Sequence, residues 1–100
     1  MYAANFVISS DRQKKTDIRT YTGGAAVADA VEPQRYERFD TPGVEYVGFI
    51  AQDIQAVLPE AVDMLSDNTL GLKQMPIVAA LWSALRETRA ELQELKNKIG

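Results

Sequence analysis

The sequence contains neither cysteine nor histidine. Without cysteine there is no disulfide framework, no thiolate nucleophile and no cysteine-ligated zinc site. Without histidine, the Ser-His-Asp triad and histidine-ligated metal centres are excluded as well. Nucleophilic chemistry in this chain therefore has to use a serine or threonine hydroxyl, with a lysine or a carboxylate as its base.

The sequence also has no excess of positive charge, and it has no long apolar run. The 11 lysines and arginines are outnumbered by 14 aspartates and glutamates, so the net charge is −3. That balance argues against nucleic acid or an anionic membrane as the main partner. The longest apolar run, residues 77–82, is far shorter than the ~20 residues of a membrane-spanning helix. No phosphate-binding loop or calcium-loop pattern is present, so we expect no cofactor and no metal ion.

With 100 residues the chain can form one small domain with a thin core. Apolar alternation and turn residues predict an α+β fold built from short elements. Strands are expected at residues 1–9, 18–22, 61–65 and 69–72, and short helices at 25–31 and 51–58. A β-hairpin of residues 35–39 and 44–50 is expected around the turn Asp40-Thr41-Pro42-Gly43. In the second short helix, Ile50, Ile54, Val57 and Leu58 share one face.

The C-terminal quarter has the clearest periodicity. Its a and d heptad positions are apolar apart from Thr88, and they are Val78, Leu81, Leu85, Thr88, Leu92, Leu95 and Ile99. Away from this stripe residues 86–98 are almost entirely polar, whereas a helix packed on its own domain has a wider apolar face. The g position Glu91 and the following e position Lys96 have opposite charges and can pair across a parallel seam. We therefore expect a coiled-coil helix over residues 75–99, the alternative being an amphipathic helix packed on its own domain.

Trp82 occupies an e position next to the seam, where a core or interface anchor is more expected than a ligand platform. Leucine at both a and d positions does not by itself select three strands over two. The number of chains in the coiled coil is therefore open on the heptad pattern alone.

The remaining candidate for nucleophilic chemistry is Ser9-Ser10 with Lys14-Lys15. A lysine can serve as the base for a serine hydroxyl when burial and neighbouring cations favour its neutral form. Arg12 has the charge that this requires. Taken alone, however, such a spacing is more often an ordinary solvated polar loop.

Three motifs, in the same order along the chain, resemble those of a known family. They are Ser10-Asp11-Arg12-Gln13-Lys14-Lys15 followed by Ile18, then Tyr36-Glu37-Arg38-Phe39, and then residues 48–62, which read Gly-Phe-Ile-Ala-Gln-Asp-Ile-Gln-Ala-Val-Leu-Pro-Glu-Ala-Val. Over residues 10–99 the chain resembles the intramolecular chaperone auto-processing domain at the C-terminus of phage tailspikes, endosialidases and tail fibres.

The resemblance implies a function and a site. Residues 10–100 would be the chaperone domain, and residues 1–9 the end of an upstream fibre or spike segment. The domain would form a homotrimer, help the β-rich upstream segment of the same polypeptide to fold in the host cytoplasm, and then release itself from this virion precursor. Ser10 would be the nucleophile, Lys15 the base and Ser9–Ser10 the cleaved bond. Lys14 stands where the family usually has an apolar residue, so it is the second candidate for the base.

The implied enzyme is a serine autoprotease that reacts once per chain. In the implied fold, small hairpins and short helices pack around the base of a long C-terminal helix, along which three copies form a parallel coiled coil. Two other functions fit the same residues. One is a trimeric assembly tip of a fibre that does not cut itself, and the other is a coiled-coil adaptor with an ordinary N-terminal loop.

Overall fold

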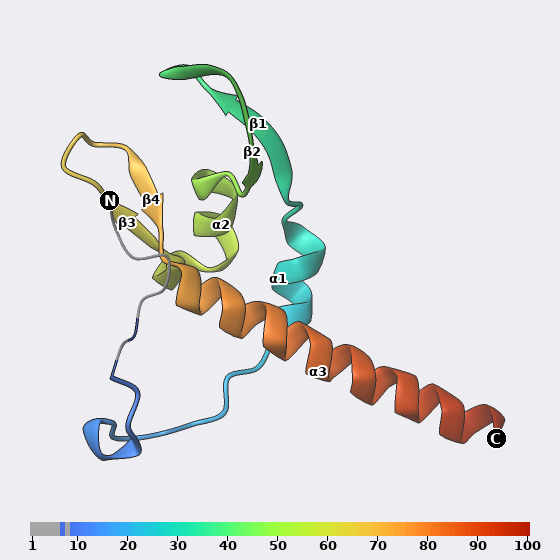
Figure 1. Ribbon diagram of the computed structural model, residues 1–100. Helices are drawn as coiled ribbons and strands as arrows, with labels where there is room; N and C mark the ends of the chain where they lie inside the picture. The colour runs from blue at the N-terminus through green and yellow to red at the C-terminus, as the bar shows by residue number, and fades with distance from the viewer. Residues whose placement is uncertain (1–6, 8) are drawn as a thin grey trace.

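The C-terminal helix α3 (Gln74–Ile99) is the longest element, and the others are arranged around it (Figure 1). The computed structural model describes residue 7 and residues 9–100. Before α3 come η1 (Arg12–Lys14), α1 (Gly24–Ala30), β1 (Gln34–Arg38), β2 (Thr41–Gly48), α2 (Ala51–Val57), η2 (Pro59–Ala61), β3 (Val62–Met64) and β4 (Leu70–Leu72). The pairs β1–β2 and β3–β4 form two separate antiparallel sheets. The predicted α+β architecture with a long C-terminal helix is confirmed.

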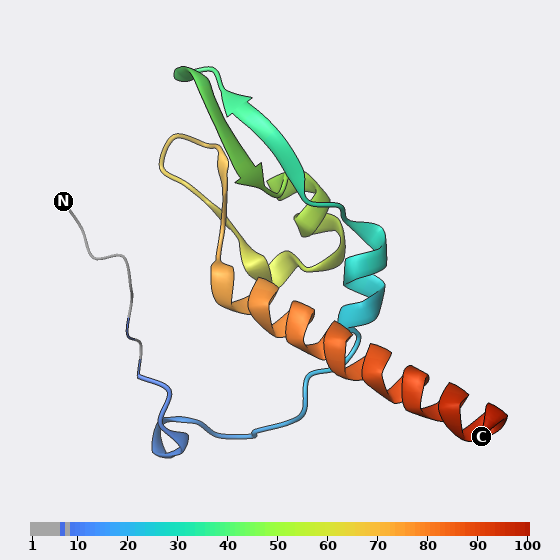
Figure 2. The same cartoon turned by 45° about the vertical axis from the view of Figure 1, so that its right-hand side comes forward.

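Most elements gather at the N-terminal half of α3, and the C-terminal half projects alone (Figures 1 and 2). The two hairpins and α2 lie on one side of α3. The segment that carries η1, residues 9–22, lies on the other side in both views. This arrangement separates that segment, which holds the predicted cleavage site, from the hairpins. The expected strand at residues 1–9 lies largely outside the described residues.

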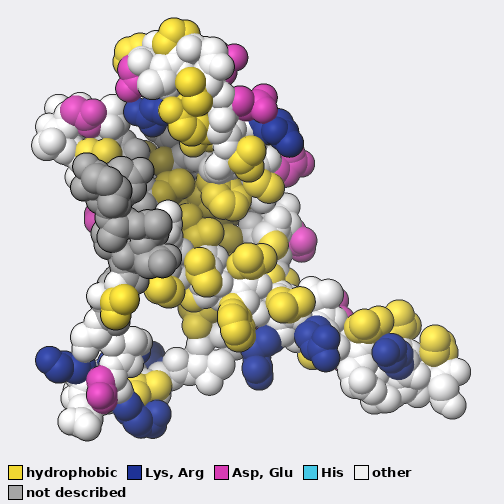
Figure 3. All heavy atoms as spheres, in the orientation of Figure 1, with side chains coloured by type: hydrophobic (Ala, Val, Ile, Leu, Met, Phe, Trp, Pro, Cys, Tyr) yellow, Lys and Arg dark blue, Asp and Glu magenta, His cyan; other side chains and the backbone are white. Residues whose placement is uncertain are grey.

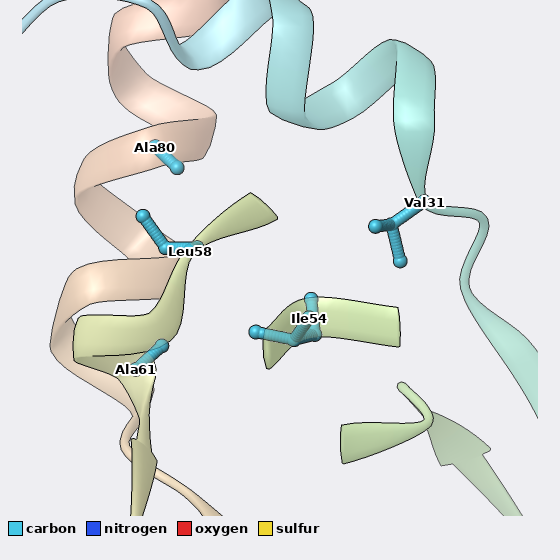
Figure 4. Packing of buried hydrophobic residues seen from close by; sticks show 5 residues of the cluster. All are labelled: Val31, Ile54, Leu58, Ala61 and Ala80. Carbon is cyan, nitrogen blue, oxygen red and sulfur yellow. The ribbon is translucent and has the colours of Figure 1, made fainter. Parts of the chain in front are cut away.

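The core lies where α1, α2 and η2 meet the start of α3. Its buried members are Val31, Ile54, Leu58, Ala61 and Ala80 (Figure 4). Ile54 and Leu58 are the buried members of the apolar face predicted for α2, whereas Ile50 and Val57 remain partly exposed. A core of so few side chains stabilises a single copy only modestly.

The expectation of a strand at residues 18–22 is wrong. The segment has no strand partner among the described residues, and Ile18 and Tyr21 are about half exposed. A β-strand requires a neighbour for its backbone N–H and C=O groups, and the side-chain preferences of this run supply none. Residues 20–22 instead run beside α3, where they line a shallow depression with Ser83 and Glu87.

The β1–β2 hairpin turns earlier along the chain than the sequence predicts. The turn is at residues 39–40, and residues 41–43, expected within the turn, belong to β2. The ladder is irregular just after Glu37. Pro42 has no N–H to donate, and Gly43 adopts a left-handed φ of 85°, so both fit an irregular end of the ladder. The Gly43 N–H donates to the Glu37 carboxylate at 3.0 Å.

Helices α1 and α3 touch through their backbones at Gly24. A Cβ atom at this position would lie 2.6 Å from the Ala84 nitrogen and 2.8 Å from the Ser83 Cβ, and closer still to the Ala80 carbonyl oxygen. These neighbours belong to the backbone and first side-chain atom of a long helix, so they cannot rotate away. Contact between α1 and α3 therefore requires glycine here.

We expect Gly24→Ala to lower the free energy of unfolding by about 3 kcal/mol, because overpacking of this severity separates the two helices. Thermal and urea unfolding monitored by circular dichroism measure the loss. Ala26→Ser, at an exposed position of the same helix, serves as the control. Equal stability of the Gly24 and Ala26 variants would contradict the close approach.

Helix α3 has two distinct faces. The face toward α1 is formed by small residues, and Ala80, Ser83 and Ala84 are buried there. The apolar a and d residues lie on a different face, and their exposed fractions range from 46% at Val78 to 80% at Ile99. Helix α3 thus packs on its own domain through its small residues, while most of the apolar a and d side chains stay largely exposed. Within the described chain this stripe remains uncovered.

Candidate active site

The short helix η1 brings Ser10 and Lys15 together. Asp11 caps it, since its carboxylate accepts the Gln13 N–H at 2.8 Å. The N–H groups of Lys14 and Lys15 donate to the carbonyls of Asp11 and Arg12 at 3.0 and 3.1 Å. This single turn reverses the direction of the chain. As a result, residues at its two ends come within reach of each other.

The Lys15 ammonium nitrogen Nζ donates a hydrogen bond to the Ser10 Oγ at 2.7 Å. That distance is the one expected between a nucleophile and its base. Ser9, Ser10 and Lys15 are all exposed, so the Ser9–Ser10 peptide bond is open to solvent. Lys15, rather than Lys14, is the lysine bonded to Ser10 among the described residues. The structure thus brings the two predicted residues into contact, and their roles stay predictions.

The segment of residues 9–22 is attached to α3 at its far end by Glu87. The Glu87 carboxylate accepts the backbone N–H of Gly23 at 2.7 Å and that of Ala25 at 2.9 Å. The Ser83 hydroxyl donates to the same carboxylate at 3.2 Å and accepts the Gly24 N–H at 3.1 Å. These bonds give partners to the N–H groups of Gly23, Gly24 and Ala25 at the start of α1. They also connect the segment that holds Ser10 and Lys15 to the helix that carries the heptads.

Residues 10–63 match the family model described as "Chaperone of endosialidase", which carries the name of a peptidase family. The chain belongs to this family. It is also 28% identical over 109 aligned residues to "Long tail fiber protein Gp37" of Salmonella phage S16. That alignment covers 99% of this chain and 15% of the phage protein, so the chain spans only a small part of that relative. The family match begins at Ser10.

Other kinds of site find no support in the part of the chain that the structure describes. No group of three or more aspartates and glutamates is placed to hold a metal ion there. Nor does any described helix have the length and apolar character needed to cross a bilayer. Among the described residues, the contact between Ser10 and Lys15 is the candidate for the predicted chemistry.

Sequence reasoning missed Ser83 and Glu87. The strand expected at residues 18–22 and the helix expected at residues 25–31 left Gly23 and Gly24 between them, whereas Gly23 is the N-cap of α1 and Gly24 its first residue. Glu87 lies off the a/d stripe among other charged residues, where an acidic side chain normally faces solvent. Nothing in the local sequence distinguishes it from a solvated charge, because its partners are backbone groups more than sixty residues away.

The Glu87 anchor predicts a loss of stability in acid. Hydrogen bonds from the Gly23 and Ala25 N–H groups lower the pKa of Glu87 below its ordinary value of 4.5. A carboxyl with a depressed folded-state pKa contributes stability that is complete above its unfolded pKa and is lost as pH falls through its folded pKa. We therefore expect the melting temperature to decrease as the pH is lowered from about 4.5. The decrease is expected to be less steep in Glu87→Gln than in the wild type.

Thermal unfolding from pH 7 to pH 3 measures this effect. Glu60→Gln, which neutralises an exposed carboxylate on η2, is the matched control and is expected to follow the wild-type curve. A Glu87→Gln curve parallel to the wild type throughout this range would show that the anchor does not depend on the charge of Glu87.

Proposed function

We propose that the chain is the C-terminal intramolecular chaperone of a phage tail fibre or spike, and that it releases itself by cleaving the Ser9–Ser10 bond. The observation that carries the proposal is the 2.7 Å hydrogen bond between the Lys15 Nζ and the Ser10 Oγ. Membership of the chaperone family and the likeness to a tail fibre protein support it. In this proposal the upstream partner is the fibre segment of the same polypeptide, and the product is a virion component.

The chemistry takes two steps. In the first, neutral Lys15 takes the proton of the Ser10 hydroxyl while the Oγ atom attacks the Ser9 carbonyl carbon. The bond from that carbon to the Ser10 nitrogen breaks, and Lys15 returns the proton to the departing amine. In the second, water hydrolyses the resulting ester, leaving a carboxylate on Ser9 and the hydroxyl on Ser10. Each chain reacts once, since its substrate is its own backbone.

The same proposal assigns the uncovered a/d stripe to a parallel homotrimer. Three copies meeting along α3 would bury the exposed leucines, and Glu91 would face Lys96 of the next helix. A core as thin as this one also gains from burial against neighbouring subunits, so assembly and stability are linked. The projecting half of α3 (Figure 1) is the part that has no other element to pack against among the described residues.

Assembly is also proposed to switch on cleavage. A lysine works as a base only in its neutral form, which burial and nearby cations favour. In a single chain both Ser10 and Lys15 are exposed, so one copy does not supply the burial. A neighbouring subunit or the upstream segment would supply it. The same exposure favours the second candidate function, a trimeric tip that never cuts itself.

Two measurements on the freshly expressed chain test the proposal. Intact-mass spectrometry is expected to show loss of residues 1–9, and sedimentation equilibrium a trimer. A full-length mass after long incubation, together with a trimer, would support the non-cleaving tip. A monomer or an antiparallel dimer would instead support the coiled-coil adaptor.

A further inference from the structure

An apolar groove lies between α1, α2 and the first turns of α3. It encloses about 260 Å³ and is lined mainly by aliphatic and aromatic side chains, among them Val27, Ala28, Val31, Phe49, Ile77 and Leu81. Figure 3 shows hydrophobic side chains gathered in the hollow between the hairpins and α3 and continuing along the helix. Val78 and Leu81 belong both to the lining and to the a/d stripe, so the groove is continuous with the proposed seam.

The groove lies on one flank of that seam. Counting Val78 as an a position places Ile77 and Ala84 at g positions, and the structure turns this g flank toward α1 and the groove. Trp82 is at an e position, which lies on the opposite flank of the helix. Its side chain is 67% exposed. The largest side chain on α3 and the groove therefore lie on opposite flanks of the a/d stripe.

We propose that Trp82 of the neighbouring copy fills this groove. The inference rests on the proposed parallel coiled coil, in which the g flank of each helix meets the e flank of the next. In that register the g position Ile77 faces the following e position of its neighbour, which is Trp82. Each copy in a closed trimer then gives one indole and receives one, which is the condition for a closed symmetric assembly.

The chemistry of the groove suits this occupant. A tryptophan side chain removes about 150–250 Å² from water when it is buried, more than any other residue available at the seam. Its indole ring brings no charge into an apolar lining, whereas the e positions further along, Arg89 and Lys96, would. Those residues fall where α3 projects beyond the groove. The groove and Trp82 thus lie at the same height along α3, in the part of the helix on which the other described elements pack.

Tryptophan fluorescence tests the inference directly, because Trp82 is the sole tryptophan. We expect the assembled chain to emit at shorter wavelength than Leu92→Asp, a variant designed to prevent assembly. Ala28→Glu places a carboxylate in the groove lining and is expected to shift the emission to longer wavelength and weaken self-association by about tenfold or more. Ala26→Glu adds the same charge to an exposed position of α1 that does not line the groove, and is expected to change neither.

A cross-link tests the register on which the inference rests, and it does not depend on Ala28→Glu remaining folded. In this cysteine-free chain, the double variant Ile77→Cys/Trp82→Cys is expected to form disulfides between copies under mild oxidation and to migrate as a covalent trimer. Ala79→Cys/Trp82→Cys is the control and is expected to remain uncross-linked.

The outcomes separate the inference from the proposed function. If the wild type sediments as a trimer but Trp82 emits as in Leu92→Asp, and Ala28→Glu behaves like Ala26→Glu, the inference is wrong and the coiled coil stands. If the wild type does not form a trimer, the assembly itself is wrong and the inference fails with it. Blue-shifted emission, sensitivity to Ala28→Glu alone and the specific cross-link together support it.

Discussion

Lys15→Ala is expected to leave the chain at full length under conditions in which the wild type loses residues 1–9. The hydrogen bond from its Nζ to the Ser10 Oγ is removed, and no base remains at that position. Loss of one member of a nucleophile–base pair slows such reactions by about 10⁴-fold or more. Intact-mass spectra over a time course measure the fraction cleaved. Because Lys15 is exposed, its truncation is expected to leave thermal unfolding unchanged.

Lys14→Ala is the matched control, since it removes the same charge one residue earlier. It is expected to cleave at close to the wild-type rate, while Ser10→Ala is expected to be as inactive as Lys15→Ala. Arrest by Lys14→Ala with normal cleavage by Lys15→Ala would assign the base to Lys14. Cleavage by Ser10→Ala would remove the proposed mechanism altogether.

Local patterns predicted most of the fold correctly. The helix α2, the second hairpin and α3 each follow from a periodicity, a turn or a proline within the element itself. The prediction of a strand at residues 18–22 was wrong because a strand needs a hydrogen-bonded neighbour, and the strand preference of one segment does not provide that neighbour. The predicted position of the turn in the first hairpin was wrong because Pro42 and Gly43 are typical turn residues but are also accepted at an irregular strand end.

In the candidate site, too, contacts between residues close in sequence could be predicted and contacts between distant elements could not. Ser10 and Lys15 are close in sequence, so the chain could be expected to join them through one short turn, and it does. Glu87, by contrast, acts on Gly23 and Ala25 across most of the chain length. The groove is likewise built from α1, α2 and α3 together. Features of this kind exist only after distant elements pack, so single-segment patterns do not reveal them.

Leu92→Asp is expected to abolish both the trimer and the cleavage. Leu92 is on the projecting half of α3 (Figure 1) and is half exposed in a single chain, so the fold of one copy should tolerate aspartate there. In the proposed seam, three carboxylates would be buried at one level, and each uncompensated buried charge costs several kcal/mol. Sedimentation equilibrium is expected to show a monomer, and intact mass an uncut chain.

Gln93→Asp introduces the same charge at the next residue, away from the a/d stripe. It is expected to remain trimeric and to cleave, so a difference between the two variants reports on the seam rather than on charge. Monomeric Leu92→Asp that still cleaves at the wild-type rate would show that Ser10 and Lys15 act within one copy. If instead assembly is required, the exposed contact between Ser10 and Lys15 stays inactive in a lone chain. Release would then follow assembly, because an unassembled copy would keep its fibre segment attached.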